Sequence, residues 1–166
     1  MSHVLTPDIC VVGGGSGGLS VAAAAAAFGV EVVLAEKGPM GGDCLNYGCV
    51  PSKSMIAAAH AAHAIRSADR FGIETAEPNV DFRKVHDHVH SVIGAITPHD
   101  SVERFEGLGV HVIEARGKFI GPTTVQAGDT VVHAKRVVVS TGSHSGAPPI
   151  PGLETVPYLT NETVFD

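Results

Sequence analysis

The chain has 166 residues, of which 44% are hydrophobic, 17% are charged and none is tryptophan. This length predicts about one domain, and the scarcity of aromatic residues favours a core of Ala, Val, Ile and Leu, which suits a buried parallel sheet. A formal net charge of -6 without a cluster of Lys and Arg excludes a nucleic-acid-binding surface, because a phosphate backbone needs a basic one.

No segment predicts a membrane partner. The longest apolar stretch, residues 19–30, is interrupted by Ser20 and Gly29 and is too short to span a bilayer. Residues 1–4 lack the basic start and long apolar core of a signal peptide. We therefore expect a cytoplasmic protein, and in that reducing compartment paired cysteines are more often catalytic or metal-binding than structural.

The first part of the chain predicts a βαβ unit. Residues 8–12 form a short apolar run that ends in glycine, residues 17–28 are rich in alanine, and residues 31–35 form a second apolar run. Strand, helix and strand in this order predict two parallel strands with a right-handed crossover. Cys10 falls inside the first strand, where we expect it to behave as a small buried hydrophobic residue.

The remainder predicts more helix and then more strand. Helices are expected over residues 51–70 and 81–107, the second broken at Pro98. Turn signals separate four short extended segments, which predicts an antiparallel meander over residues 110–115, 118–120, 123–126 and 130–134. A last buried strand over residues 137–140 and an extended, Pro-rich tail over residues 147–157 follow. The predicted fold class is α/β.

A glycine-rich loop joins the first strand to the first helix. Gly13, Gly15 and Gly18 satisfy the pattern G-x-G-x-x-G, in which glycines permit a tight turn and let the backbone approach a pyrophosphate at the helix N-terminus. Glu36 ends the second strand, where a carboxylate accepts hydrogen bonds from a ribose diol. A glycine-rich turn without a ligand is the competing interpretation. The strand, helix and acid in register favour dinucleotide binding, although the loop alone does not distinguish FAD from NAD.

Two cysteines follow closely. Cys44 and Cys49 are separated by four residues, one of them Gly48, and Cys49 precedes a predicted helix start at Pro51. The helix N-terminus favours a thiolate there, and Lys53 adds positive charge. A dithiol stores two electrons, which is what a reduced flavin delivers. A structural zinc site would need further ligands at matching spacing, and two unrelated buried cysteines would not need the surrounding glycines. A redox pair is therefore the favoured interpretation.

The histidines predict no metal site. His86 and His90 are four residues apart on a predicted helix, a spacing at which two imidazoles can share a metal ion. The only further ligand nearby is Asp87, which is expected to face away. We therefore expect a solvated helix face there.

Two motifs carry a resemblance to a known family. The run Gly41-Gly42-x-Cys44-x-Asn46-x-Gly48-Cys49-x-Pro51-Ser52-Lys53 resembles the active-site signature of the class I pyridine nucleotide–disulfide oxidoreductases, which include dihydrolipoamide dehydrogenase and mercuric reductase. Ser140-Thr141-Gly142-Ser143, followed by residues 148–152, matches the second flavin-domain motif of that family. The similarity spans residues 8–166. It implies a Rossmann-like FAD-binding domain, with FAD as cofactor and NAD(P)H as electron donor.

The resemblance also implies roles for individual residues. Cys49 would be the flavin-proximal, charge-transfer thiol, and Cys44 the interchange thiol that attacks the substrate. Asp43 stands where the family often has Thr, whose hydroxyl contacts phosphate. The implied cofactor-binding residues are Gly13, Gly15, Ser16, Gly17, Gly18, Glu36, Lys37, Gly42, Asp43, Cys44, Lys53, Gly117, Thr141 and Gly142.

The resemblance implies a whole reaction and a larger enzyme. Electrons would pass from NAD(P)H through FAD to the Cys44–Cys49 disulfide, and then to a small-molecule disulfide or a metal-ion substrate. Family members also carry a separate NAD(P)H domain and a dimerisation domain, so we expect residues 1–166 to be the FAD-binding portion only, inactive alone, of an enzyme that is a homodimer at full length. The alternative is a flavin-independent thiol redox or binding module.

Overall fold

The computed structural model describes residues 3–166, so Met1 and Ser2 of the segment inspected for a signal peptide lie outside the described residues. The chain forms two compact units. The first comprises residues 1–44 and 97–144, and the second comprises residues 45–96 and 145–166. Each is described by itself below.

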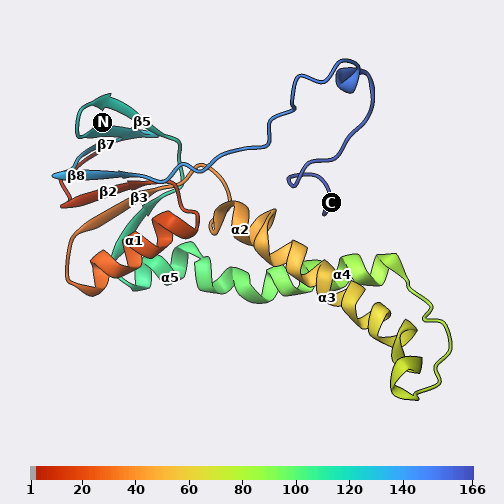
Figure 1. Ribbon diagram of the computed structural model, residues 1–166. Coiled ribbons are helices and arrows are strands. Elements are labelled where there is room, and N and C mark those ends of the chain that lie inside the picture. Colours follow the sequence, from red (N-terminus) through yellow and green to blue (C-terminus); the bar gives the residue numbers. More distant parts are fainter. Residues whose placement is uncertain (1–2) are drawn as a thin grey trace. The chain divides into compact units, whose positions relative to one another are not determined.

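A parallel sheet forms the centre of the first unit (Figure 1). Its strands lie in the order β4 (Val110–Ile113), β3 (Val32–Ala35), β2 (Ile9–Val12) and β8 (Arg136–Val139), and each neighbouring pair is parallel. Helix α1 (Ser16–Ala27) connects β2 to β3. The predicted βαβ unit and the α/β fold class are therefore confirmed.

A second sheet packs on the first. Strands β5 (Gly117–Gly121), β6 (Thr124–Ala127) and β7 (Thr130–His133) form an antiparallel meander, as predicted. Strand β1 (His3–Leu5) adds to it in parallel with β7. Strand β1 was not predicted from the sequence; it has only three residues, and two of them are exposed.

The prediction was wrong for residues 110–115, which were expected in the meander. Strand β4 instead lies parallel to β3, with Val110 opposite Val32. The connection from β3 to β4 is long and ends in helix α5 (Val102–Gly107), so the chain crosses back along the sheet and enters β4 in the parallel direction. Val110 and Val112 are buried, which completes the core beneath α5.

Strand β2 is buried on both faces. Val11 packs with Leu19 of α1 and with Phe105 of α5. The neighbouring side chains of Cys10 and Val12 point to the other face, where they pack with Val125 and Val132 of the meander. A strand held from both sides fixes the position of the glycine loop that follows it.

The second unit is mainly helical. Helix α2 (Gly42–Asn46) starts in the first unit, and α3 (Cys49–Arg66) follows it. Helix α3 packs against α4 (Phe82–Ile96) within the second unit. A 3-10 turn, η1 (Ala68–Phe71), ends the first helical stretch at the predicted place.

The second predicted helical stretch is interrupted, as expected, at Pro98. It consists of α4, the 3-10 turn η2 (Thr97–Asp100) and α5. The tail after β8 contains one further short turn, η3 (Leu153–Thr155). Among residues 3–166, no helix combines the length and the apolar character needed to cross a membrane.

Candidate active site

A cleft of about 270 Å³ lies at the carboxyl end of the parallel sheet. Strands β2 and β3 end at this cleft, and the loop after β8 borders it. In the sheet, β3 lies on one side of β2 and β8 lies on the other, so the strand order reverses at β2. Ligands of open α/β sheets bind at such a reversal. The lining residues are Val12, Gly13, Ala35, Glu36, Lys37, Arg116, Gly117 and Thr141.

The glycine loop is required by the protein's own packing. Gly13 has a φ of 110°, and a Cβ there would lie 2.2 Å from the carbonyl oxygen of Ser140. A Cβ on Gly18 would lie 1.8 Å from the carbonyl oxygen of Gly13. Gly17 differs, because a Cβ at that position would meet nothing within 4 Å. Gly13 and Gly18 therefore allow close backbone contacts that no other residue could make, whereas position 17 has room for a side chain.

The N-terminus of α1 faces out of this loop. Gly15 is the N-cap residue, and it has no side chain with which to cap the first N–H groups of the helix. Ser16 and Gly17, the first two residues of α1, are exposed. Uncapped N–H groups at the positive end of a helix dipole suit a phosphate group.

Glu36 connects two loops of the site. Its carboxylate accepts a hydrogen bond of 2.5 Å from the backbone N–H of Gly14 and another of 2.7 Å from that of Gly38. The side chain is half-buried and lines the cleft. Both carboxylate oxygens are thus engaged by the backbone, a contact that the sequence analysis did not predict for this acid.

The first glycines of the cysteine motif pack on the glycine loop. The N–H of Gly41 donates to the carbonyl of Gly14 over 2.9 Å, and Gly41 forms an isolated parallel bridge with Gly15. Gly42 has a φ of 58°, and a Cβ there would lie 2.7 Å from the Cα of Gly15. The spacing of these glycines therefore reflects contact between two backbones.

The two cysteines of the motif belong to helices. Cys44 is half-buried in α2, whose exposed Asp43 lies in the first turn. Cys49 is exposed and is the first residue of α3, so the predicted helix start is confirmed to within two residues. Lys53 follows four residues later in the same helix and is also exposed, at a spacing that places two side chains on one helix face.

Gly117 and its neighbours form the floor of the cleft. A Cβ on Gly117 would lie 2.8 Å from a methyl group of Val12, so only glycine lets β5 cross the end of β2 at this distance. Arg116 was not predicted as a site residue. It carries no motif signal, although it directly precedes Gly117.

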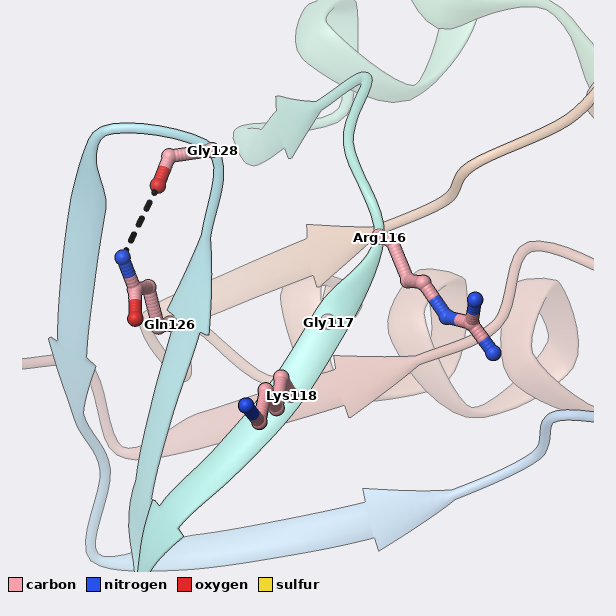
Figure 2. Close-up of a pocket in the computed structure, with 5 residues that line it drawn as sticks. All are labelled: Arg116, Gly117, Lys118, Gln126 and Gly128. Atoms are coloured by element: carbon pink, nitrogen blue, oxygen red, sulfur yellow. Dashed lines mark hydrogen bonds between the residues drawn. The ribbon is translucent and has the colours of Figure 1, made fainter.

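A larger cleft of about 680 Å³ adjoins this floor. It is lined by Arg116, Gly117, Lys118, Gln126 and Gly128. In Figure 2 the side chains of Arg116 and Lys118 extend in different directions from either side of Gly117, and the Gln126 amide donates to the carbonyl of Gly128 over 3.4 Å. The two cations do not converge, so the smaller cleft, where three strands end, is the better candidate.

The loop after β8 is tied to the glycine loop. The Ser140 hydroxyl lies 3.1 Å from the carbonyl of Val12 and 3.0 Å from that of Gly13, and it donates to them. Thr141 lines the cleft, and Gly142, with a φ of 65°, is exposed beside it. Thr141 and Gly142 were predicted from the sequence as cofactor contacts, whereas the positioning role of Ser140 was not predicted.

Cys10, the third cysteine of the chain, lies in the core and not at the cleft. Its side chain is fully buried, as predicted, and burial raises the pKa of its thiol to about 11. A thiol with this pKa is overwhelmingly protonated at neutral pH and is a poor nucleophile.

We therefore expect Cys10 to resist iodoacetamide at pH 8 in the folded protein, while the exposed Cys49 is alkylated. In guanidinium chloride all three cysteines should react. Peptide mass spectrometry after a timed pulse measures each site, and equal labelling of Cys10 and Cys49 before unfolding would contradict the assignment.

Comparisons with known proteins show the family to which the chain belongs. A family model described as pyridine nucleotide-disulphide oxidoreductase matches residues 7–165. Mercuric reductase of Streptomyces lividans is 35% identical over 165 residues, which cover 96% of this chain and 35% of that protein. Mercuric reductase of Bacillus cereus is 31% identical over 159 residues, covering 96% of this chain and 25% of that protein.

Two further relatives extend the comparison. Dihydrolipoyl dehydrogenase of Halobacterium salinarum is 38% identical over 144 residues, which cover 82% of this chain and 30% of that protein. The solved structure of the HOCl-induced flavoprotein disulfide reductase RclA from Escherichia coli shares the fold, with a TM-score of 0.71 and 24% identity over 90% of this chain and 31% of that one. The chain thus spans about a quarter to a third of the length of these three curated relatives.

Proposed function

Because the chain belongs to the pyridine nucleotide-disulphide oxidoreductase family, we propose that it binds FAD in the 270 Å³ cleft and that Cys44 and Cys49 form the redox pair of a flavin-dependent disulfide oxidoreductase. Family membership implies FAD, with NAD(P)H as the electron donor. One observation carries the proposal. Residues from four separate segments, each named from the sequence as a cofactor contact, line one cleft, namely Gly13, Glu36 and Lys37, Gly117, and Thr141.

The residues of the cleft fit an adenine dinucleotide. A Cβ at Gly17 would meet nothing within 4 Å, so the start of α1 is open, and its uncapped N–H groups are available to a pyrophosphate. Glu36 places a carboxylate at the end of β3, where it would accept from ribose hydroxyls while it orients the loop. Bound FAD would supply a two-electron carrier that the amino acids lack.

The cysteine motif would supply the electron acceptor. Gly41 and Gly42 anchor the start of the motif on the glycine loop, so Cys44 follows directly from a segment held at the proposed pyrophosphate site. Cys49 is exposed and begins α3, five residues after Cys44. Once the pair is reduced, the thiolate of Cys44 would attack one sulfur of a disulfide substrate, forming a mixed disulfide and releasing the other sulfur as a thiolate that takes a proton from solvent. Attack by Cys49 on Cys44 of the mixed disulfide would form the Cys44–Cys49 disulfide again and release the second thiolate, which is protonated likewise. A metal ion is the second class of substrate that we propose, and the whole enzyme would be a homodimer.

Titrating FAD with the purified chain tests the binding step. We expect saturable quenching of FAD fluorescence and retention of the visible flavin absorption on gel filtration. A colourless protein that never binds FAD, yet whose thiols still exchange with small disulfides, would contradict the proposal and support a flavin-independent thiol module.

A thiol count tests the electron-transfer step. The oxidised, FAD-loaded chain is reduced anaerobically with dithionite, the small reductant is removed, and reactive thiols are titrated. We expect two additional thiols in wild type, and none of this gain in Cys44→Ser or Cys49→Ser. Cys10→Ala is the matched control and should keep the gain, because Cys10 is buried elsewhere in the core. A gain that survives loss of Cys49 would contradict the assigned pair.

A further inference from the structure

Two imidazoles meet on the surface of α4. His86 and His90 are separated by one helical turn, and their rings lie 4.2 Å apart between centroids. Their Nε2 atoms are 3.0 Å apart. Two nitrogen atoms therefore converge on one point next to the helix, and His86 and His90 are respectively half-buried and exposed, so that point is open to small solutes.

This separation suits two ligands at a right angle on one metal ion. With metal–nitrogen bonds of about 2.05 Å, ligands at 90° lie about 2.9 Å apart, whereas tetrahedral ligands lie about 3.4 Å apart. The observed 3.0 Å is close to the first value. Right-angle nitrogen ligands are characteristic of tetragonal Cu²⁺ and Ni²⁺, and Cu²⁺ binds imidazole more tightly than other divalent ions of its row.

Two neighbouring groups lie close to the pair. The carboxylate of Asp87 lies 3.8 Å from Nδ1 of His86, beyond hydrogen-bond distance, so its negative charge is near the ring nitrogen that does not belong to the pair. Asp87 was expected from its place in the helix to face away from the pair. Nε2 of His90 lies 3.0 Å from the carbonyl oxygen of Phe165, to which it donates in the metal-free protein, so an ion bound by His90 replaces this hydrogen bond.

We propose that His86 and His90 chelate a divalent transition-metal ion of tetragonal preference, Cu²⁺ above Ni²⁺, at a site separate from the flavin cleft. The competing interpretation is a hydrogen bond in which one Nε2 donates to the other. Binding an ion requires both Nε2 atoms to present lone pairs, with the ring protons on the two Nδ1 atoms. The proposal stands on the geometry of α4 and is independent of the proposed redox function.

Copper titration followed by electron paramagnetic resonance tests the site. The His3→Gln/Cys44→Ser/Cys49→Ser chain is used throughout, because thiolates bind and reduce Cu²⁺ and a histidine at position 3 of a free N-terminus chelates Cu²⁺ together with backbone nitrogens. We expect one bound Cu²⁺ per chain. Its resonance should show splitting by two imidazole nitrogens. Either His86→Gln or His90→Gln should weaken binding by about tenfold or more, because the second ligand no longer acts at a high effective concentration.

His88→Gln is the matched control, since His88 lies on the same helix, is exposed and is outside the pair. It should leave affinity and spectrum unchanged. The proposal is overturned if His88→Gln weakens binding as much as His86→Gln does, if the spectrum contains a single imidazole nitrogen, or if Cu²⁺ is not bound at millimolar concentration. A double variant that binds no more weakly than either single one would support chelation by the two side chains as one unit.

Discussion

Gly18→Ala should destabilise the protein by about 4 kcal/mol or more, at the upper end of effects of single substitutions. The new Cβ would lie 1.8 Å from the carbonyl oxygen of Gly13 and 2.7 Å from the hydroxyl of Ser140. The first neighbour is backbone, in a loop fixed between β2 and α1, so it has no alternative rotamer. For a chain of this size a loss of 4 kcal/mol lowers Tm by roughly 10 °C. Differential scanning calorimetry measures the shift.

Gly17→Ala is the control one residue earlier in the same helix. Its Cβ would meet nothing within 4 Å, and alanine raises helix stability by about 0.5–1 kcal/mol over glycine. We expect Gly17→Ala to keep or slightly raise Tm. If the two variants lowered Tm equally, the loss of stability in Gly18→Ala would not come from the contact between its Cβ and the carbonyl oxygen of Gly13. Saturable FAD quenching should be lost in Gly18→Ala at temperatures where that variant is still folded.

Glu36→Ala should lower stability before any cofactor is added. It removes the acceptor of the Gly14 and Gly38 N–H groups, and Gly14 is buried, so an unsatisfied donor there costs about 1–3 kcal/mol. Glu36→Gln keeps one acceptor and turns an N–H group toward the other donor, so its loss should be intermediate. Thermal unfolding of the FAD-free chain measures both.

Glu106→Gln is the comparison for charge alone, because Glu106 is exposed on α5. Its Tm should stay within about 1–2 °C of wild type, as expected of a surface substitution. If Glu36→Ala left Tm of the FAD-free chain unchanged but abolished FAD binding, Glu36 would act on the ligand only. We expect Glu36→Ala to lower both the Tm of the FAD-free chain and the affinity for FAD. That result would show that Glu36 stabilises the glycine loop and also contacts the ligand.

The βαβ unit was predictable because its signals are local. An apolar run, a glycine pattern and an alanine-rich run follow one another within the first 35 residues, and the structure places β2, α1 and β3 there. Gly13 and Glu36 were predicted from the same signals, since the end of a strand defines which residues reach the sheet edge. The start of α3 at Cys49 follows from Pro51 in the first turn.

Features that depend on distant partners were not predictable. Residues 110–115 have the same alternation as a meander strand, and only the pairing with β3 distinguishes them. The contact of Gly42 with Gly15 joins two segments whose patterns each suggest a ligand instead. The hydroxyl of Ser140 bonds to the carbonyl groups of Val12 and Gly13, which precede it by 128 and 127 residues in the sequence. Sequence periodicity carries no information about such neighbours.

The pairing of β2 with β8 has a consequence for the order in which the domain is assembled. Ile9 pairs with Arg136 and Val12 pairs with Val139, so the central strand is made early and receives its second neighbour only when β8 leaves the ribosome. Until then, one edge of an apolar strand has open N–H and C=O groups, which is the kind of edge at which nascent chains associate. Long-range parallel pairing of this kind also slows folding, because a large loop must close first. The strand that leads into the glycine loop therefore keeps one edge unpaired until residues 136–139 have been made.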